Sequence, residues 1–197
     1  QWNLENKFTG WEDVPLTQKG ISEAENAGIL IRKNNIKIDK IFSSVLQRAN
    51  NTAKITVKTA KLDHFFEGTK LIYTRSNSLN ERDYGDLVGL NKDETAKKFG
   101  KEQVQIWRRS YDTNPPGGES LKDVVDRVSP YFSKNIEPLI QNKKNILIVA
   151  HGNSLRAIMI KIGMYKPEKI SSIELPTGSP LCINFENGQI IDHYYLN

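Results

Sequence analysis

Residues 145–150 form a short run, Asn-Ile-Leu-Ile-Val-Ala, in which every side chain after the first is apolar. A continuous apolar run of this length is typical of a strand that is buried on both faces of a parallel sheet. We expect a helix to follow directly, over residues 154–162. A buried strand that leads into a helix restricts the chain to folds in which helices cover a parallel sheet.

Strands and helices alternate along the rest of the chain. We expect helices over residues 17–31, 44–57, 92–99 and 121–132, and strands over 40–43, 70–74, 180–186 and 189–194. The last two strands are joined by Asn187-Gly188, a strong hairpin signal. The order predicts an α/β fold, a three-layer α/β/α sandwich with a mostly parallel central sheet, in one domain over residues 1–197. In such sheets ligands bind beyond the carboxyl ends of the strands.

The formal net charge is +5 and the isoelectric point is about 9.2. A basic balance is compatible with nucleic acid, an anionic membrane or small anionic substrates. The lysines are scattered, and no arginine-rich tail or repeated basic-aromatic platform accompanies them. We interpret the charge as a solvated surface and expect no nucleic-acid partner.

Membrane and compartment signals are weak in this sequence. No apolar run approaches membrane-spanning length, and no signal peptide opens the chain, so we expect no membrane partner. Cys182 is the single cysteine, which excludes an internal disulfide. We therefore expect a cytoplasmic protein in a reducing compartment.

The most specific local feature is Ala-His-Gly-Asn-Ser at residues 150–154, between the apolar strand and the following helix. Gly152 would let the backbone come close to a ligand, and amides at the helix start would point at an anion. His151 could donate a proton or a hydrogen bond to a phosphoryl oxygen. A histidine that merely caps a sheet edge would give the same local pattern.

Other charged residues gather in two segments. Glu81, Arg82 and Tyr84 share one glycine-terminated loop, which could combine proton transfer with anion binding or could be an ordinary solvated loop. Arg108 and Arg109 stand beside aromatic residues and could clamp a phosphate or carboxylate, or could belong to a basic helix surface.

Two further segments are less informative. Arg48 follows a strand by about one helical turn, so it could point back to the strand ends or lie on the surface. In the polar and aromatic opening loop, Thr9 and Gly10 could offer a hydroxyl and an amide to a substrate, although an ordinary turn fits equally.

Taken together and in order, these segments resemble cofactor-dependent, that is 2,3-bisphosphoglycerate-dependent, phosphoglycerate mutases of the histidine phosphatase superfamily, in their compact bacterial form. The matching segments are residues 2–3, 8–11, 13–17, 43–49, 79–85, 89–92, 107–112, 150–156 and 176–178. Residues 54–78 match least well. The Trp-Arg-Arg-Ser-Tyr block and the Asn-Glu-Arg loop separate mutases from the broader phosphatases, so the joint pattern favours the functional interpretations above.

The resemblance implies a phosphoglycerate mutase-like fold and a reaction. 2-Phosphoglycerate and 3-phosphoglycerate would be interconverted through a phosphohistidine that 2,3-bisphosphoglycerate primes, without a metal. It makes Glu81 the general acid and base, and gives His151 the role of stabilising the transferring phosphoryl group. It assigns phosphate or substrate binding to Asn3, Thr9, Gly10, Arg48, Arg82, Asp83, Tyr84, Lys92, Arg108, Arg109, Gly152 and Asn153. It also implies a homodimer or a dimer of dimers.

One part of the family pattern is missing. The nucleophilic histidine should stand in an Arg-His-Gly motif just before Trp2, at the end of a first strand. The histidines of this sequence are His64, His151 and His193, and only His151 matches a family position, that of the second histidine. We expect that the first strand is missing through truncation, that these 197 residues alone are inactive, and that the native protein is an active mutase.

Three other functions fit parts of the sequence. A histidine-type phosphatase of the same superfamily is one, although the block at residues 107–112 argues against it. A non-catalytic phosphoglycerate-binding relative would keep the arginines, but would not need Glu81 or His151. A nucleic-acid binder rests on net charge alone and would require steep salt dependence of DNA binding.

Overall fold

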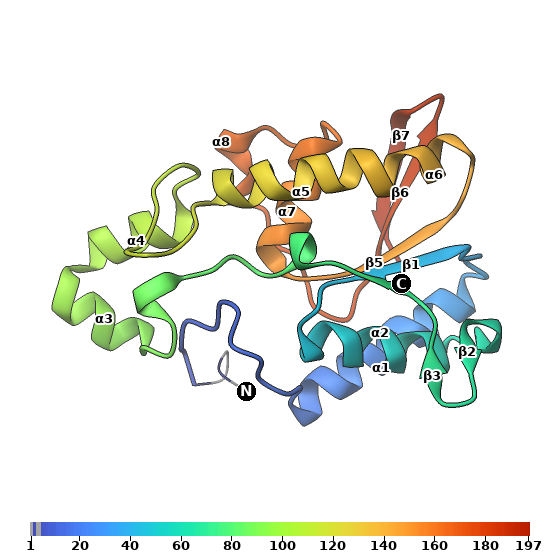
Figure 1. Ribbon diagram of the computed structural model, residues 1–197, viewed down its shortest axis with the longest axis horizontal. Coiled ribbons are helices and arrows are strands. Elements are labelled where there is room, and N and C mark those ends of the chain that lie inside the picture. The colour runs from blue at the N-terminus through green and yellow to red at the C-terminus, as the bar shows by residue number, and fades with distance from the viewer. Residues whose placement is uncertain (1, 3–4) are drawn as a thin grey trace.

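The structure, a computed structural model, describes residue 2 and residues 5–197 (Figure 1). Within these residues the central sheet has three parallel strands in the order β4–β1–β5. They are Thr74–Arg75 (β4), Lys40–Ser43 (β1) and Ile146–Val149 (β5). The predicted α/β fold with a parallel central sheet is confirmed. The predicted site residue Asn3 lies outside the described residues.

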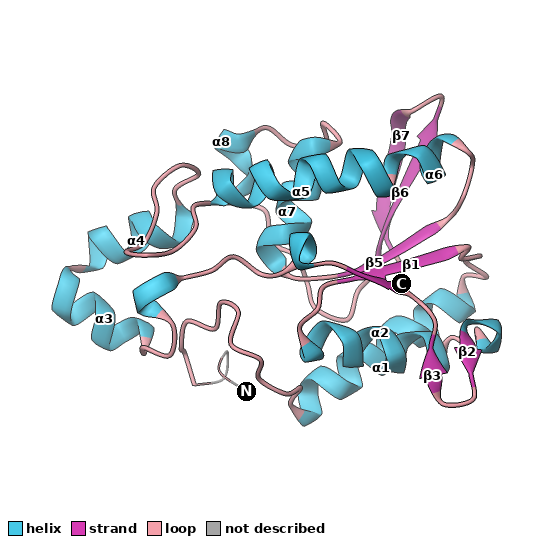
Figure 2. Cartoon of the chain, viewed as in Figure 1, coloured by secondary structure: helices cyan, strands magenta, loops and turns pink. Residues whose placement is uncertain are grey.

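Helices cover both faces of this sheet (Figure 2). The helices α1 (Gln18–Lys33) and α2 (Gln47–Thr59) pack against each other on one face. On the opposite face lie α5 (Leu121–Asn135) and α7 (Gly152–Lys161), which also pack together. The two layers arise because successive side chains of a strand point to opposite faces and both faces are apolar.

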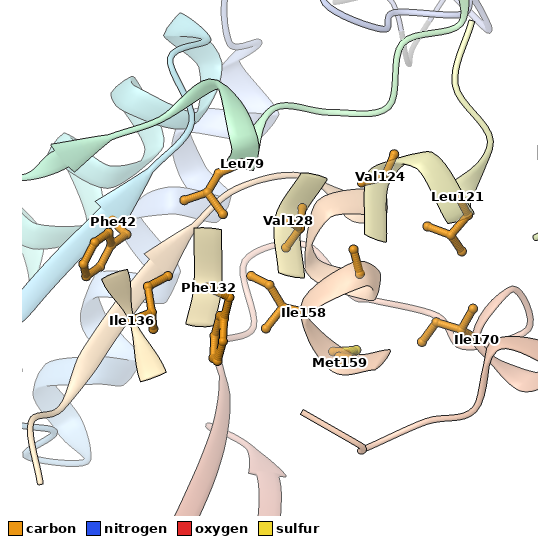
Figure 3. Close-up of a cluster of buried hydrophobic side chains, with 11 residues drawn as sticks. Phe42, Leu79, Leu121, Val124, Val128, Phe132, Ile136, Ile158, Met159 and Ile170 are labelled. Carbon is orange, nitrogen blue, oxygen red and sulfur yellow. The ribbon is translucent and has the colours of Figure 1, made fainter. Parts of the chain in front are cut away.

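Strand β1 shows this division directly. Ile41 belongs to a buried cluster with Val57 of α2, whereas Phe42 belongs to a second cluster with Val128 of α5 and Ile158 of α7 (Figure 3). All five side chains are almost fully buried. Burying each such side chain contributes about 1.5–3 kcal/mol, so these two clusters provide much of the stability of the fold.

Helix starts follow the capping residues of the sequence. The predicted N-cap Thr17 accepts a hydrogen bond from Gly20 N, and Ser120 and Asp123 form a reciprocal capping box at α5. The helix predicted from residue 44 begins instead at Gln47, because Leu46 has an extended backbone. Asp13 then caps this helix, since its Oδ1 accepts from Gln47 N at 2.7 Å.

The prediction of one strand over residues 70–74 was wrong. Lys70–Leu71 (β3) pairs antiparallel with Phe66–Glu67 (β2), and Thr74–Arg75 then pairs with β1. The chain changes partner at Ile72, whose N donates to Phe65 O at 2.7 Å. Residues 70–75 therefore contribute strands to two different sheets.

The hairpin at the C-terminus is confirmed. Strands β6 (Leu181–Glu186) and β7 (Gln189–Tyr195) pair antiparallel, apart from the central sheet. Asn187 and Gly188 have φ values of 51° and 79°, which a tight hairpin turn requires.

Helices α3 (Lys92–Phe99) and α4 (Lys101–Arg109) form the end of the molecule opposite the β2–β3 hairpin (Figure 1). They cover a small core of Phe8, Leu87, Val104 and Trp107. The remaining short helices are α6 (Glu137–Gln141), α8 (Pro167–Ile170) and the 3₁₀ turns η1 (Asp63–Phe65), η2 (Asn77–Leu79) and η3 (Gly85–Leu87).

Candidate active site

His151 occupies the N-cap position of α7, directly beyond the carboxyl end of β5. Its side chain is buried, and its Nε2 lies 2.7 Å from Ser44 Oγ at the end of β1. Burial lowers the pKa of His151 to about 4, against the opposing effect of the Glu81 carboxylate. The imidazole is therefore neutral at pH 7 and offers one donor and one acceptor.

Glu81 faces the start of the same helix. Its Oε1 accepts hydrogen bonds from Arg82 N at 2.7 Å and from Asn153 N at 3.2 Å. Burial would raise the pKa of this carboxyl, but His151 and the two amides lower it, and the net pKa lies below the usual value. Glu81 is thus an ionised acceptor beside His151, as a general base must be.

The main chain around Glu81 is fixed by side chains from other elements. Arg127 of α5 donates through Nη2 to Glu81 O at 3.0 Å and forms an ion pair with Glu119 at 2.7 Å. Glu119 Oε2 in turn accepts from Asp83 N at 2.9 Å. The indole of Trp11, 41% exposed, donates to the same Glu81 oxygen at 2.5 Å and lies against the Arg127 guanidinium.

Arg48 links the opening loop to α2. It donates through Nη1 to Glu12 O and through Nη2 to Gly10 O, both at 2.9 Å. Gly10 has a φ of +53°, and a Cβ there would lie 3.0 Å from Val88 Cγ2, so the close approach requires glycine. Burial lowers the pKa of Arg48, opposed by the charges of Glu81 and Asp13, but an arginine stays protonated at neutral pH.

These elements enclose a groove of about 620 Å³ at the carboxyl end of β5. The predicted site residues that line it are Thr9, Gly10, Arg48, Glu81, Tyr84, Lys92, His151 and Gly152. The groove continues along β5 past residues 147–149, between α1 and the segment 175–180. The predicted site residues thus bring His151, Glu81 and the cations Arg48 and Lys92 to one groove.

A second, smaller pocket of about 180 Å³ adjoins the groove, since Tyr84 lines both. The other predicted residues that line it are Arg82, Arg108, Arg109 and Asn153. Arg82 is 1% exposed and donates through Nη2 to Tyr84 Oη at 2.9 Å and to Arg108 O at 3.2 Å. The arrangement offers anion-binding groups at two neighbouring positions.

Asp83 and two of the histidines lie outside both pockets. Asp83 lines neither, and its Oδ1 accepts from Gly85 N at 2.9 Å, so its role in substrate binding stays a prediction. His64 packs against Phe65, and His193 lies in β7. Neither histidine lines the groove or the pocket.

Ser44, which contacts His151, and Arg156, which lines the smaller pocket, were not predicted as site residues. Ser44 directly follows strand β1, and a polar residue at the carboxyl end of a parallel strand is itself a signal of a site. Arg156 stands four residues after Gly152 in α7, and this spacing puts both on one face of the helix. Glu119 and Arg127, which hold the main chain around Glu81, have no such local signal. Glu119 precedes α5 and Arg127 lies within it, so both are distant in sequence from the loop that they contact.

Two further observations concern the described part of the chain. Within residue 2 and residues 5–197, no group of three or more His, Cys, Asp or Glu side chains is arranged to hold a metal ion. None of the helices in that same part has the length and apolar character needed to cross a membrane.

Residues 1–194 match the family model of the histidine phosphatase superfamily (branch 1). The chain belongs to the histidine phosphatase superfamily. Within this superfamily, a relative from Beijerinckia indica subsp. indica is 50% identical over 91% of this chain and 84% of its own length. A relative from Azorhizobium caulinodans is 48% identical over 92% and 85%. Both are named 2,3-bisphosphoglycerate-dependent phosphoglycerate mutase, so the predicted family resemblance is confirmed.

Solved structures of the superfamily share the fold. The α-ribazole phosphatase from Shigella flexneri gives a TM-score of 0.78 at 22% identity, over 100% of this chain and 91% of that one. The mycobacterial glucosyl-3-phosphoglycerate phosphatase in complex with VO3 gives 0.75 at 24% identity, over 91% and 85%. At 22–24% sequence identity these two structures show that the fold is shared, and they say nothing about the activity of this chain.

Proposed function

We propose that the protein interconverts 2-phosphoglycerate and 3-phosphoglycerate through a phosphohistidine primed by 2,3-bisphosphoglycerate. The observation that carries this proposal is the pairing of a His151–Glu81 groove with an adjoining arginine-lined pocket. A substrate with one phosphate and a second anionic group at the other end matches two neighbouring anion sites. The names of the relatives from Beijerinckia and Azorhizobium support the same reaction.

In this proposal the residues act on charge and on protons. The neutral imidazole of His151 and the first amides of α7 donate to the transferring phosphoryl group, which carries negative charge. Glu81, ionised and beside the groove, accepts a proton from the substrate hydroxyl and returns it. Arg48 and Lys92 hold the phosphate in the groove.

The nucleophile of the proposed reaction is a histidine that the 197 residues do not supply. His64 and His193 line neither pocket, and His151 has the role of the second family histidine. Within the described residues β5 is at the edge of its sheet, and the groove extends along β5. An added strand could pair there and bring a histidine to the carboxyl end.

The residues present also fit the primer. Arg48, Lys92 and the α7 amides suit one phosphate, and the guanidinium groups of Arg82, Arg108 and Arg109 suit a second anionic group. When bound, 2,3-bisphosphoglycerate would supply the phosphoryl group that loads the histidine. We further propose a cytoplasmic location and a homodimer or dimer of dimers, as in the family resemblance.

The test is an assay of the native full-length protein with 3-phosphoglycerate, followed by ³¹P NMR with and without trace 2,3-bisphosphoglycerate. We expect 2-phosphoglycerate to appear, faster with the primer and with little inorganic phosphate. Glu81→Gln should abolish this conversion, whereas Glu102→Gln, an exposed change in α4, should not. Rapid release of inorganic phosphate without 2-phosphoglycerate would replace the proposal by a phosphatase.

A second measurement concerns the nucleophile. The intact mass of the purified native protein should exceed the 22.4 kDa of these residues, and a phosphorylated histidine should map to the additional segment. Protein of 22.4 kDa that interconverts the phosphoglycerates would refute the assignment of the nucleophile. Binding of phosphoglycerate without any turnover by the native protein would instead favour a non-catalytic relative.

A further inference from the structure

The smaller pocket contains an unusual concentration of positive charge. Four of its lining residues are arginines: Arg82, Arg108, Arg109 and Arg156. Among the described residues that line it, none is an aspartate or a glutamate. Guanidinium groups that share a pocket without a carboxylate repel one another, and an anion from solvent would relieve this repulsion.

Arg156 is held in a fixed position within this group. Its Nη2 donates to Ile173 O at 2.8 Å. Its Nη1 lies 3.1 Å from the point where a Cβ on Gly152 would stand, so the guanidinium covers the start of α7. A side chain at residue 152 would press on the guanidinium, which would have to shift to make room.

The Nε atoms of Arg156 and Arg82 are buried and have no hydrogen-bond partner. Among the described residues only one other buried side-chain polar atom, Tyr131 Oη, shares this property. A buried donor without an acceptor costs about 1–3 kcal/mol. Both residues line the smaller pocket, so their guanidinium groups are incompletely paired within the protein and can take an acceptor that arrives with a ligand.

The charges around Arg156 agree with this interpretation. Burial is the main cause that lowers the pKa of its guanidinium, and the nearby positive charges of Arg109 and Arg82 lower it further. The carboxylate of Glu81 and the phenol of Tyr84 oppose them. Arg156 therefore lies between the Glu81 end of the groove and the arginines of the pocket.

We infer that Arg156 is a substrate-binding residue, and that its guanidinium and that of Arg82 bind the carboxylate of a phosphoglycerate whose phosphate lies at the start of α7. The inference rests on the proposed function and adds a residue to it. A planar carboxylate has two oxygens and can accept from two guanidinium groups at once. Arg156 would then select three-carbon phosphates that carry an acid group over those that lack it.

The test is calorimetric titration of the native full-length protein with two probes, 3-phosphoglycerate and glycerol 3-phosphate, which lacks the carboxylate. Arg156→Met should weaken 3-phosphoglycerate binding by roughly tenfold to a hundredfold, the effect of one charged hydrogen bond. It should leave glycerol 3-phosphate binding unchanged. The matched control is Lys161→Met in the same helix, whose ammonium pairs with Glu137 outside the pocket.

Arg156→Lys provides the second variant, because it keeps the charge but removes the planar guanidinium. It should bind 3-phosphoglycerate more weakly than the parent protein and should fold if the methionine variant does not. An equal loss for both probes, or no loss for either, would overturn the inference. Intact binding without turnover in the parent protein would refute the proposed reaction and leave the Arg156 inference standing, whereas no binding of 3-phosphoglycerate by the parent would refute both.

Discussion

Arg127 reaches from α5 to the main-chain oxygen of Glu81 and donates to it from Nη2 at 3.0 Å. The same guanidinium donates to Ser78 O at 2.8 Å and to Asn80 O at 3.1 Å. One side chain therefore satisfies three carbonyl groups of the loop that carries the proposed general base. Its charge is balanced by Glu119, which also accepts from the loop at Asp83 N.

Replacement of Arg127 should impair turnover more than binding. Arg127→Met frees the loop, and a displacement of about 1 Å at a reacting group can reduce the rate about a hundredfold. We expect kcat to fall by roughly this factor and KM to change little. Steady-state kinetics of the mutase reaction would measure both. Arg127→Lys is the milder variant, and Lys122→Met, which breaks an exposed ion pair in the same helix, is the control. Equal losses in kcat with Lys122→Met would refute this role.

Ser44→Ala should lower both the stability of the protein and the rate of the proposed reaction. The change removes the hydroxyl that lies 2.7 Å from His151 Nε2 and leaves a buried ring nitrogen without a partner. We expect a loss of about 1–3 kcal/mol in the free energy of unfolding, measured by urea titration, and a lower kcat. Ser172→Ala removes an exposed hydroxyl, bonded to Lys169 O, and should change neither quantity. Parent-like values for Ser44→Ala would mean that this contact does not fix the imidazole.

Acidification should weaken the fold through His151. In the unfolded chain this side chain takes up a proton near pH 6.5, but in the folded protein only near pH 4. Between these values the unfolded state binds more protons, so stability falls as the pH falls, by up to about 3 kcal/mol at 1.36 kcal/mol per pKa unit. Glu81, with its lowered pKa, adds a further loss only below its unfolded pKa, near pH 4.5.

Urea titrations at several pH values between 7 and 4 would measure this effect. His151→Gln should flatten the curve above pH 4.5, and His193→Gln, an exposed change in β7, should not. The same pH dependence in the parent and in His151→Gln would contradict the assignment of the effect to this histidine.

Gly28→Ala should be strongly destabilising, because α1 and α2 touch at this glycine. A Cβ there would lie 2.5 Å from Thr56 O and 2.7 Å from Thr59 Cβ, both in the neighbouring helix. Separating the helices costs about 1–3 kcal/mol, which thermal unfolding would detect. Gly20→Ala in the same helix meets only a flexible leucine side chain at 3.2 Å and is the control. A melting temperature that falls no more for Gly28→Ala than for Gly20→Ala would contradict this packing.

The sequence predicted best where one local rule decides the structure. The strand before His151 and the turn at Asn187-Gly188 were predicted correctly, because apolar continuity and positive φ are local properties. The start of α2 was predicted three residues too early, since its capping group is the side chain of Asp13, which is distant in sequence. Residues 70–74 divide between two sheets, and partner choice is a tertiary effect that periodicity does not contain.

The same division holds for the site. Glu81, Arg48 and His151 were identified from motifs and do line one groove. Arg156 has no distinguishing local pattern, and its importance follows from a pocket of four arginines that only three-dimensional packing assembles. Glu119 and Arg127 escaped notice for a similar reason, because they act on the main chain of another segment.

The position of Trp11 gives the site an optical reporter. Its indole is partly exposed, donates to the carbonyl of Glu81 and lies beside the Arg127 guanidinium. Indole emission shifts in wavelength and intensity when its hydrogen bonding or hydration changes. A ligand that moves the Glu81 loop, even slightly, should therefore alter the fluorescence of this tryptophan. Of the other two tryptophans, Trp107 lies in the small core under α4, whereas Trp2 lies beside Lys7 and lines the groove, so Trp2→Phe would leave Trp11 as the tryptophan nearest the loop. Stopped-flow emission could then follow motion of the proposed catalytic loop in real time, without any attached dye.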